Sequence, residues 1–223
     1  MDLKVAILVD GGFYRRRAKY LWGEKSPKER ADELEHYCHK HLKDSFSNCY
    51  LYRIFYYDCP PSEKRVNHPI EQGKCIDLKK TEQYSWTSDL FSELKKKRKF
   101  ALRLGRLSED NVNYILSYDA TKKLFSGKKS ISDITLDDFD LNIVQKGVDM
   151  KIGVDITSMS IRNQVDRIVL ISGDSDFVPA AKQARREGID FILDPMGQSI
   201  KEDLGEHIDG IKSYAKGKRT KQI

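Results

Sequence analysis

Short apolar runs alternate along this chain with longer segments in which apolar residues recur at helical spacing. The runs are rich in β-branched and aromatic side chains, which is typical of buried strands, and they cover residues 4–9, 50–57, 100–104, 168–172 and 190–193. Helical spacing covers residues 13–21, 25–42, 84–98, 146–162 and 177–187, with a last helix expected from about residue 201. Strands that alternate with helices predict a mainly parallel sheet in a three-layer α/β/α sandwich.

One segment departs from this alternation. Residues 107–145 show a strand-like stretch near 112–118, followed by an excursion rich in Lys and Asp that we expect to project from the core. The stretch 62–73 is polar and is predicted to be a loop. We therefore expect a single domain over residues 1–215, with an excursion at 107–145 and a disordered basic tail at 216–223.

Acidic residues follow two of the predicted strands directly. Asp10 ends the first apolar run, and Asp174 and Asp176 come just after the run at 168–172. The carboxyl ends of parallel strands form the edge of a sheet at which ligands bind. Carboxylates held close together there repel one another unless a cation or a proton joins them. The pattern predicts a divalent-metal site, although Asp10 taken alone is explained better as a helix N-cap.

The helix at 146–162 carries two further acids. Its buried stripe is predicted to be Val148, Ile152, Ile156 and Met159. Asp149 then lies in the first turn, near the same edge of the sheet, and Asp155 lies about 9 Å further along the helix axis, at a rise of 1.5 Å per residue. A half-buried carboxylate at Asp155 needs a partner, so a salt bridge to an Arg or Lys on a neighbouring helix and a catalytic role both remain open.

Charge and composition favour a polyanionic partner. The 223 residues carry a net charge of +6, with basic clusters at 15–19, 95–99 and 212–221. Such clusters around an acidic centre suit a nucleic acid that approaches a metal, although solvated helix faces and a disordered end explain each cluster as well. No apolar run approaches the ~18 residues of a membrane span, and the first run is too short for a signal peptide, so we expect a cytoplasmic protein without membrane contact.

The cysteines do not indicate a metal or disulfide framework. The four cysteines lack C-x-x-C spacing. The stretch 36–41 contains three histidines and Cys38, but no second ligand pair follows at zinc-finger spacing. We interpret this stretch as surface residues of a helix.

Several stretches resemble the NYN domain, a PIN-like nuclease family, and its LabA-like bacterial and archaeal branch in particular. The matching stretches are 9–14, 145–155 and 172–179, and residues 104–107 are similar to the family's middle strand. The resemblance implies a PIN-like, Rossmann-like fold and an acidic metal-binding cluster. The implied catalytic residues are Asp10, Asp149, Asp174 and Asp176.

The resemblance also ranks the possible ligands. It implies Asp10, Asp149 and Asp174 as metal ligands, with Asp176 and Asp155 as further candidates. One position differs from the family pattern, because Phe13 stands where many relatives have Asn. This difference removes a possible hydrogen-bond donor to the substrate or to a metal-bound water.

The function that we expect is a metal-dependent ribonuclease. Hard carboxylate ligands would hold Mg²⁺ or Mn²⁺, which lowers the pKa of a bound water and neutralises charge on the phosphate. Residues near the acids are expected to position the RNA backbone, namely Ser172, Arg15, Arg16, Lys146 and Lys151.

Two other functions compete with this one. A non-catalytic RNA-binding or regulatory protein could retain the acidic metal site. A phosphohydrolase of the haloacid-dehalogenase type needs Asp-x-Asp after the first strand, and Gly12 stands at the second acidic position. The sequence does not distinguish RNA from DNA, and it leaves the oligomeric state open, with a homodimer as one alternative.

Overall fold

The structure is a computed structural model that describes residues 2–44, 47–200 and 202–215. The predicted basic tail at 216–223 lies outside the described residues. The chain divides into two compact units. Unit 1 takes in the described residues within 1–59, 89–105 and 147–223, and unit 2 consists of residues 60–88 and 106–146. Each unit is considered by itself.

A parallel sheet forms the centre of unit 1, as the alternating pattern predicts. In the described residues it has the strand order β10-β9-β8-β1-β2-β5, and each neighbouring pair is parallel. Its strands are β1 (Asp2–Asp10), β2 (Asn48–Asp58), β5 (Phe100–Leu104), β8 (Arg167–Ile171), β9 (Asp190–Asp194) and β10 (Gly210–Ile211). The central strands are apolar because both of their faces are covered, and every residue from Val5 to Val9 is fully buried.

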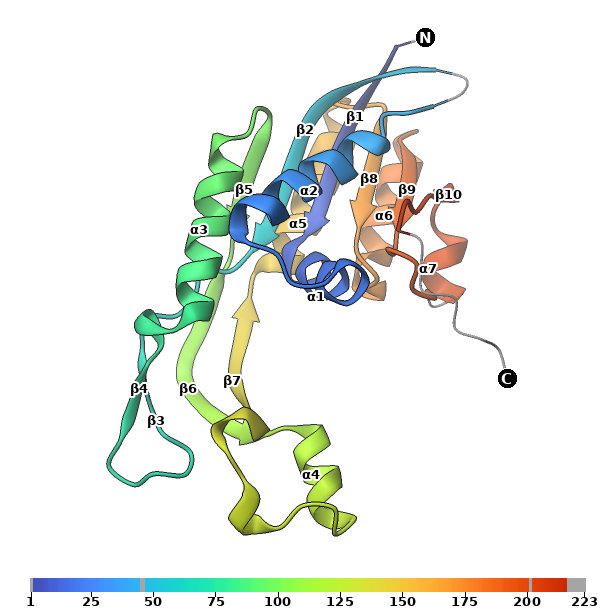
Figure 1. Cartoon of the computed structure of the whole chain (residues 1–223). Helices are drawn as coiled ribbons and strands as arrows, with labels where there is room; N and C mark the ends of the chain where they lie inside the picture. Colours follow the sequence, from blue (N-terminus) through green and yellow to red (C-terminus); the bar gives the residue numbers. More distant parts are fainter. Residues whose placement is uncertain (1, 45–46, 201, 216–223) are drawn as a thin grey trace. The chain divides into compact units, whose positions relative to one another are not determined.

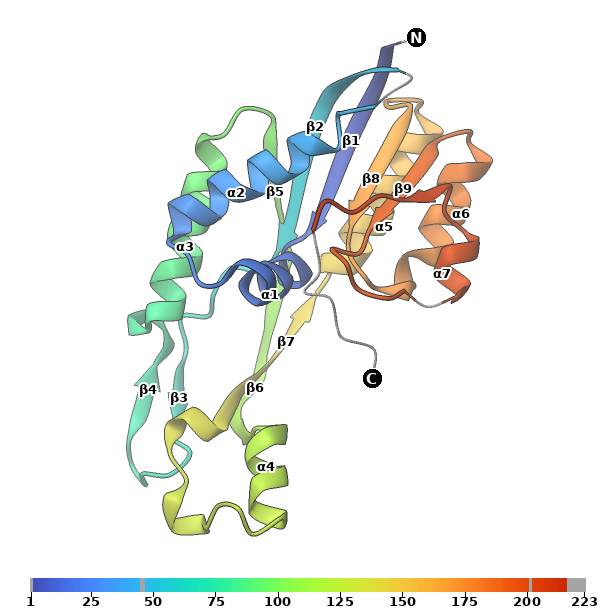
Figure 2. The same ribbon diagram turned by 45° about the vertical axis from the view of Figure 1, so that its right-hand side comes forward.

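Helices cover both faces of this sheet and complete the three predicted layers. α1 (Gly11–Trp22), α2 (Pro27–Lys40) and the second half of α3 (Glu82–Lys96) lie on one face, and α5 (Val148–Ile161) and α6 (Val178–Arg186) lie on the other (Figures 1 and 2). A short helix, α7 (Glu202–Glu206), precedes β10. Among the helices in the described part of the chain, none is both long and apolar enough to cross a membrane.

Local sequence signals set the ends of these helices. α2 begins with a capping box, in which Ser26 accepts a hydrogen bond from the Glu29 amide while the Glu29 carboxylate accepts one from the Ser26 amide, and Pro27 follows at the first helical position. The buried side of α5 contains Val148, Ile152, Ile156 and Met159, as predicted from their spacing.

Unit 2 consists of two antiparallel ribbons and short helices. β3 (Arg65–Asn67) pairs with β4 (Cys75–Asp77), and β6 (Arg106–Leu116) pairs with β7 (Phe139–Lys146). The remaining elements are η1 (Leu78–Lys80), α4 (Tyr118–Phe125), η2 (Ile131–Asp133) and η3 (Leu136–Asp138).

Sequence patterns describe unit 2 less accurately than unit 1. The strand predicted near 112–118 is longer and begins earlier, and it ends where Ser117 caps α4 by accepting a hydrogen bond from the Ala120 amide. The predicted loop at 62–73 contains β3. β7 shows a short alternation, in which Phe139, Leu141 and Ile143 are half-buried and Asp140 and Asn142 are exposed. None of its residues is fully buried, and the prediction missed this strand.

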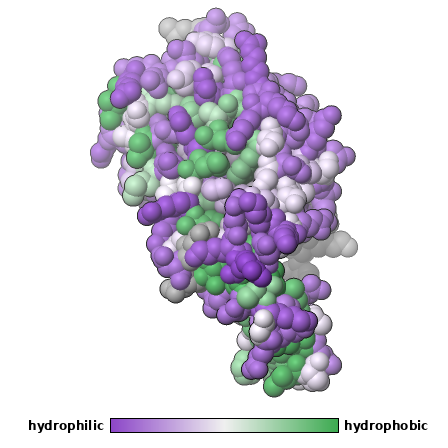
Figure 3. All heavy atoms as spheres, turned by 90° about the vertical axis from the view of Figure 1, so that its left-hand side faces the viewer, coloured by the Kyte–Doolittle hydropathy of each residue, from purple (hydrophilic) through white to green (hydrophobic). Residues whose placement is uncertain are grey.

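Large apolar side chains of unit 2 are exposed. Figure 3 shows green, hydrophobic side chains gathered at its lower end, at the level of α4. The exposed large apolar residues of unit 2 include Ile115, Tyr118, Phe125, Ile131, Leu136 and Val144. Exposure of several large apolar groups is unusual for a ribbon that has to be stable alone.

The interpretation of residues 36–41 as surface residues is wrong for Tyr37, Cys38 and His41, which are buried. His41 Nε2 lies 2.8 Å from Asp194 Oδ2 at the end of β9, and the Tyr37 hydroxyl donates to the same oxygen. A buried carboxylate needs such partners, and this partner cannot be found from local spacing because it lies more than 150 residues away.

A close contact at Gly11 gives a test of how α1 is placed. A Cβ atom built at Gly11 would lie 2.6 Å from the fully buried Tyr56 ring. We expect Gly11→Ala to lower the free energy of unfolding by about 1–3 kcal/mol, because the ring and the helix start cannot both keep their positions. Urea denaturation measures the change.

Gly153→Ala on α5 is the matched control. A Cβ atom there meets nothing within 4 Å. Alanine is expected to stabilise this helix by up to about 1 kcal/mol. Equal effects of the two substitutions would contradict the close packing of α1 on β2.

Candidate functional site

The candidate site lies where the order of strands reverses. From β1 the chain proceeds outward to β2 and β5, and it then returns to β8 on the other side of β1. This arrangement creates a topological switch point between β1 and β8, at whose carboxyl ends parallel α/β proteins bind ligands. Val9 pairs with Ile171, so Asp10 and Ser172 follow at the same level. β1 and β8 are neighbours in the sheet, so the acids that follow them arrive at the same edge.

Asp10 is held rigidly at this edge. Its Oδ1 accepts a hydrogen bond from the Phe13 amide at 3.0 Å, so it caps α1, and its Oδ2 accepts one from the Ser172 hydroxyl at 3.2 Å. Burial raises the pKa of Asp10, the two hydrogen bonds oppose the rise, and the Asp149 carboxylate adds to it. The N-cap role and the position at the cluster are therefore both present in one side chain.

Ser172 connects the two strand ends. This buried residue donates to Asp10 and accepts a hydrogen bond from the Asp174 amide at 3.3 Å. Asp174 then caps η4 (Ser175–Phe177), because its Oδ1 accepts from the Asp176 amide at 3.0 Å. Both Asp174 and Asp176 are exposed. The loop after β8 thus presents two carboxylates to solvent beside the fixed carboxylate of Asp10.

Asp149 reaches the same place from α5. Gly147 precedes that helix in the left-handed conformation, with φ of 80°, and puts Asp149 in the first turn. Partial burial raises the pKa of Asp149, and the charges of Asp174 and Asp176 raise it further. Together with the effect of Asp149 on Asp10, these interactions show that carboxylates from three distant stretches lie within electrostatic range of one another.

The chemistry of these groups fits a hard divalent cation, but the side chains do not enclose one. Carboxylate oxygens are the ligands that Mg²⁺ and Mn²⁺ prefer, and a cation would remove the mutual repulsion that raises the pKa of Asp149. Within the residues that the structure describes, no three His, Cys, Asp or Glu side chains are close enough to hold a metal ion. A chelate would require the exposed Asp149, Asp174 and Asp176 side chains to turn inward.

Asp155 lies in a different environment. The Tyr57 hydroxyl donates to its Oδ2 at 2.8 Å, and Arg103 Nε donates to the same oxygen at 3.1 Å. Of the two explanations left open for this residue, the salt bridge is present, and its partner comes from β5 instead of a helix. No local pattern could have identified Tyr57 and Arg103 as partners of Asp155, because they lie on β2 and β5, far from α5 in the chain.

A second acid at this edge, Asp58, is also engaged. It ends β2 as Asp10 ends β1, yet its side chain is fully buried and forms an ion pair with Arg15 at 3.1 Å. Tyr56 and the Cys59 amide donate to it as well. Burial raises the pKa of Asp58, and the Arg15 guanidinium opposes the rise. The signal in the sequence that could have identified Asp58 is an acid directly after an apolar run, as at Asp10.

The other basic residues expected to bind substrate lie on the surface. Arg16 is exposed on α1, and its charge lowers the pKa of Asp10. Lys151 is exposed on α5 in unit 1. Lys146 is exposed at the end of β7 and belongs to unit 2. Phe13 is buried, and its Cε2 lies 3.0 Å from the place that a Cβ atom of Gly173 would take, so the ring supports the loop after β8.

A family comparison decides the identity of the fold. Residues 76–204, more than half of the chain, match the family model described as NYN domain. The chain belongs to the NYN domain family. The match includes Asp149, Asp174 and Asp176 and excludes Asp10, which the pairing of β1 with β8 adds to the site. NYN domains have a PIN-like nuclease fold, and NYN and PIN-like nucleases generally use divalent metals and act on nucleic acid.

Other comparisons add little to this assignment. A protein of unknown function from Vibrio parahaemolyticus, VPA0982, has a crystal structure that superposes with a TM-score of 0.46 at 14% identity. The alignment covers 95% of this chain and 93% of that chain. No curated protein matches the sequence.

Repulsion at the cluster predicts a gain in stability when a charge is removed. An acid whose pKa is raised by folding binds more protons in the folded state than in the unfolded state, so its ionisation costs stability as the pH rises through that raised pKa. We expect Asp149→Asn in this NYN protein to raise the free energy of unfolding at pH 7 by at most about 1 kcal/mol, since the group is largely exposed.

Urea denaturation across a pH series measures this gain. It should disappear as the pH falls through the raised pKa of Asp149 towards its usual value of 3.8. Asp137→Asn, at an exposed acid on η3, is the control and should change stability by less than about 0.5 kcal/mol. A lower free energy of unfolding for Asp149→Asn at pH 7 would contradict the claim that repulsion between Asp149 and its acidic neighbours lowers stability.

Proposed function

We propose that this NYN protein is a ribonuclease that hydrolyses RNA phosphodiesters with the help of Mg²⁺ or Mn²⁺ bound at the switch point. The observation that supports the proposal is the convergence of Asp10, Asp149 and Asp174 from β1, α5 and the end of β8. Repulsion among acids at an open edge of a sheet lowers stability, whereas a bound cation would stabilise all of them together.

Each acid has its own part in this proposal. Asp10, fixed by two hydrogen bonds, would serve as the rigid ligand, and Asp149 and Asp174 would close on the ion from either side. Asp176 is a further ligand candidate, and Asp155 is a weaker one because Tyr57 and Arg103 already occupy its carboxylate. The chemistry that a bound ion supplies at such a site is a water of lowered pKa and neutralisation of charge on the phosphate oxygens.

Substrate contacts belong to the residues around the acids. Arg16, exposed next to Asp10, is the first candidate to bind the phosphate backbone, and Lys151 and Lys146 are further candidates. Arg15 would have to share its guanidinium with Asp58. Ser172 would act through Asp10 and Asp174, because its hydroxyl is bound to both.

The finer assignments follow from the same residues. We assign the chain to the LabA-like branch on the motifs at 9–14 and 172–179, and we expect it to work in the cytoplasm. The family resemblance favours RNA over DNA as the substrate.

The alternative function is an RNA-binding protein that regulates without cleaving. It is favoured by one specific observation, namely that in the described residues the acids do not enclose a metal position. The buried Phe13, in place of a polar side chain next to Asp10, points the same way.

A cleavage assay separates the two functions. A labelled single-stranded RNA incubated with the protein and Mn²⁺ or Mg²⁺ should be cut, and EDTA should stop the reaction. We expect Asp174→Asn and Asp149→Asn each to reduce the rate at least about 100-fold, because each removes one ligand charge from the site.

Asp137→Asn is the control for charge, since it removes an exposed acid of unit 2. It should cut RNA at the rate of the unmodified protein. If the unmodified protein binds RNA but does not cut it under any metal condition, the nuclease proposal is rejected in favour of the regulatory function.

A further inference from the structure

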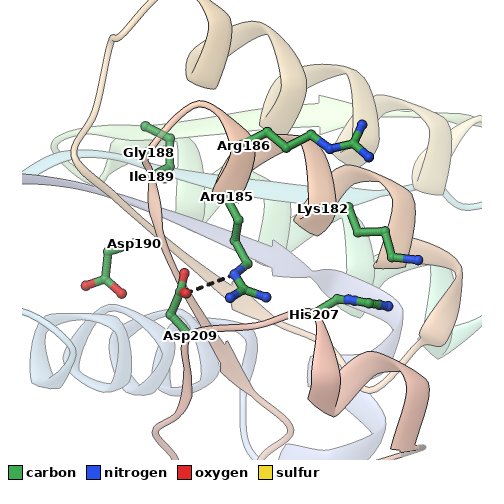
Figure 4. A pocket seen from close by; sticks show the side chains of 8 residues that line it. All are labelled: Lys182, Arg185, Arg186, Gly188, Ile189, Asp190, His207 and Asp209. Carbon is green, nitrogen blue, oxygen red and sulfur yellow. Dashed lines mark hydrogen bonds and ion pairs between the residues drawn. The ribbon is translucent and has the colours of Figure 1, made fainter.

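A basic groove lies on unit 1, away from the acidic edge. A cavity of about 680 Å³ opens between α6 and the segment that follows α7. Figure 4 shows the residues that line it, among them Lys182, Arg185 and Arg186 from α6 and His207 from beyond α7. Two acids, Asp190 and Asp209, also line the groove.

Both acids of the groove are already paired. Asp209 Oδ1 accepts a hydrogen bond from Arg185 Nε at 2.9 Å, and its Oδ2 accepts one from the Phe191 amide at 2.8 Å. Asp190 forms an ion pair with Arg167 at 2.5 Å. Arg185 therefore neutralises Asp209, and Arg167 neutralises Asp190.

Two cations of the groove are left over. Lys182 and Arg186 are exposed, and within the described part of the chain neither has an acidic partner within ion-pair distance. Stabilisation of the helix C-terminus explains a basic residue in the last turn, as for Arg186, but it does not explain Lys182 one turn earlier. The pair is one helical turn apart, and Figure 4 shows both side chains extended in the same direction.

Local structure holds the end of the helix that carries these side chains. α6 ends in a Schellman motif, in which the Ile189 amide donates to the Ala184 carbonyl and the Gly188 amide donates to the Arg185 carbonyl. Gly188 adopts the left-handed conformation that this motif needs, with φ of 80°. The motif holds the last turn of α6 in place, and the Arg185–Asp209 pair connects it to the segment after α7.

We propose that Lys182 and Arg186 bind successive phosphates of a single-stranded RNA, whose chain runs along α6 from the acidic edge. Cations in a row along a helix match a backbone, whereas a site for one small anion would direct its donors at a single point. α6 begins directly after η4, and its nine residues are about 13 Å long at 1.5 Å per residue, so one strand can reach both places. This inference rests on the proposed action on RNA.

The test uses the full chain with cleavage switched off. In an Asp149→Asn background with EDTA, the variant Lys182→Gln/Arg186→Gln is compared with Lys28→Gln/Arg53→Gln, which removes one exposed Lys and one exposed Arg elsewhere on unit 1. Fluorescence anisotropy with a labelled single-stranded RNA measures Kd over a series of salt concentrations. Thermal melting checks that both variants fold.

We expect the groove variant to bind RNA about tenfold more weakly and the control pair to bind as the background protein does. The slope of log K against log salt should fall by about 1.4 in the groove variant, at about 0.7 for each phosphate contact to a single strand. Equal affinities and slopes for the two pairs would overturn the proposal. The proposal would also be overturned if the groove variant lost the binding of pyrophosphate, used as a small-anion probe, but kept its affinity for RNA.

The outcomes for the groove and for the nuclease are independent. Weaker RNA binding by the groove variant would support the groove even if the unmodified protein never cuts RNA, and the nuclease proposal alone would then fail. If the unmodified protein cuts RNA and the groove variant binds RNA as strongly as before, the proposal of an RNA-binding groove is refuted and the nuclease proposal stands.

Discussion

The parallel pairing of β1 with β8 is the interaction on which the site depends. Because Val9 is level with Ile171, Asp10 and Ser172 emerge side by side although 162 positions separate them in the chain. The Ser172 hydroxyl then connects the two strand ends, and the Asp174 amide extends this network into the loop after β8. Asp149 joins from the other face of the sheet through the first turn of α5. Displacement of either strand by one residue would separate these groups.

The acids at the ends of strands fall into two groups, and the surroundings of each acid distinguish a structural role from a place in the candidate site. Asp58 and Asp194 are fully buried, and each is bound by several donors, so both are structural. Asp10 and Asp174 face an open edge and other acids. Hydrogen-bond donors surround the first group, whereas the second group has other acids as neighbours, a pattern that is common in functional sites.

The sequence predicts unit 1 well because its signals are local. Apolar runs such as 168–172 and the stripe of α5 depend on burial against the sheet, and acids at strand ends follow from topology. The partners of Asp155 and Asp58 could not be predicted, since Tyr57, Arg103 and Arg15 reach them across other elements. β7 was missed although Phe139, Leu141 and Ile143 alternate with polar residues, because this alternation is short and stands in a stretch rich in Lys and Asp.

Crystals of the protein soaked in Mn²⁺ test the central claim most directly. Anomalous scattering at the manganese edge locates the ion independently of any activity. The account predicts a peak bounded by the carboxylates of Asp10, Asp149 and Asp174, with the exposed side chains turned inward. Carboxylates that stay dispersed, with no peak between them, would contradict it.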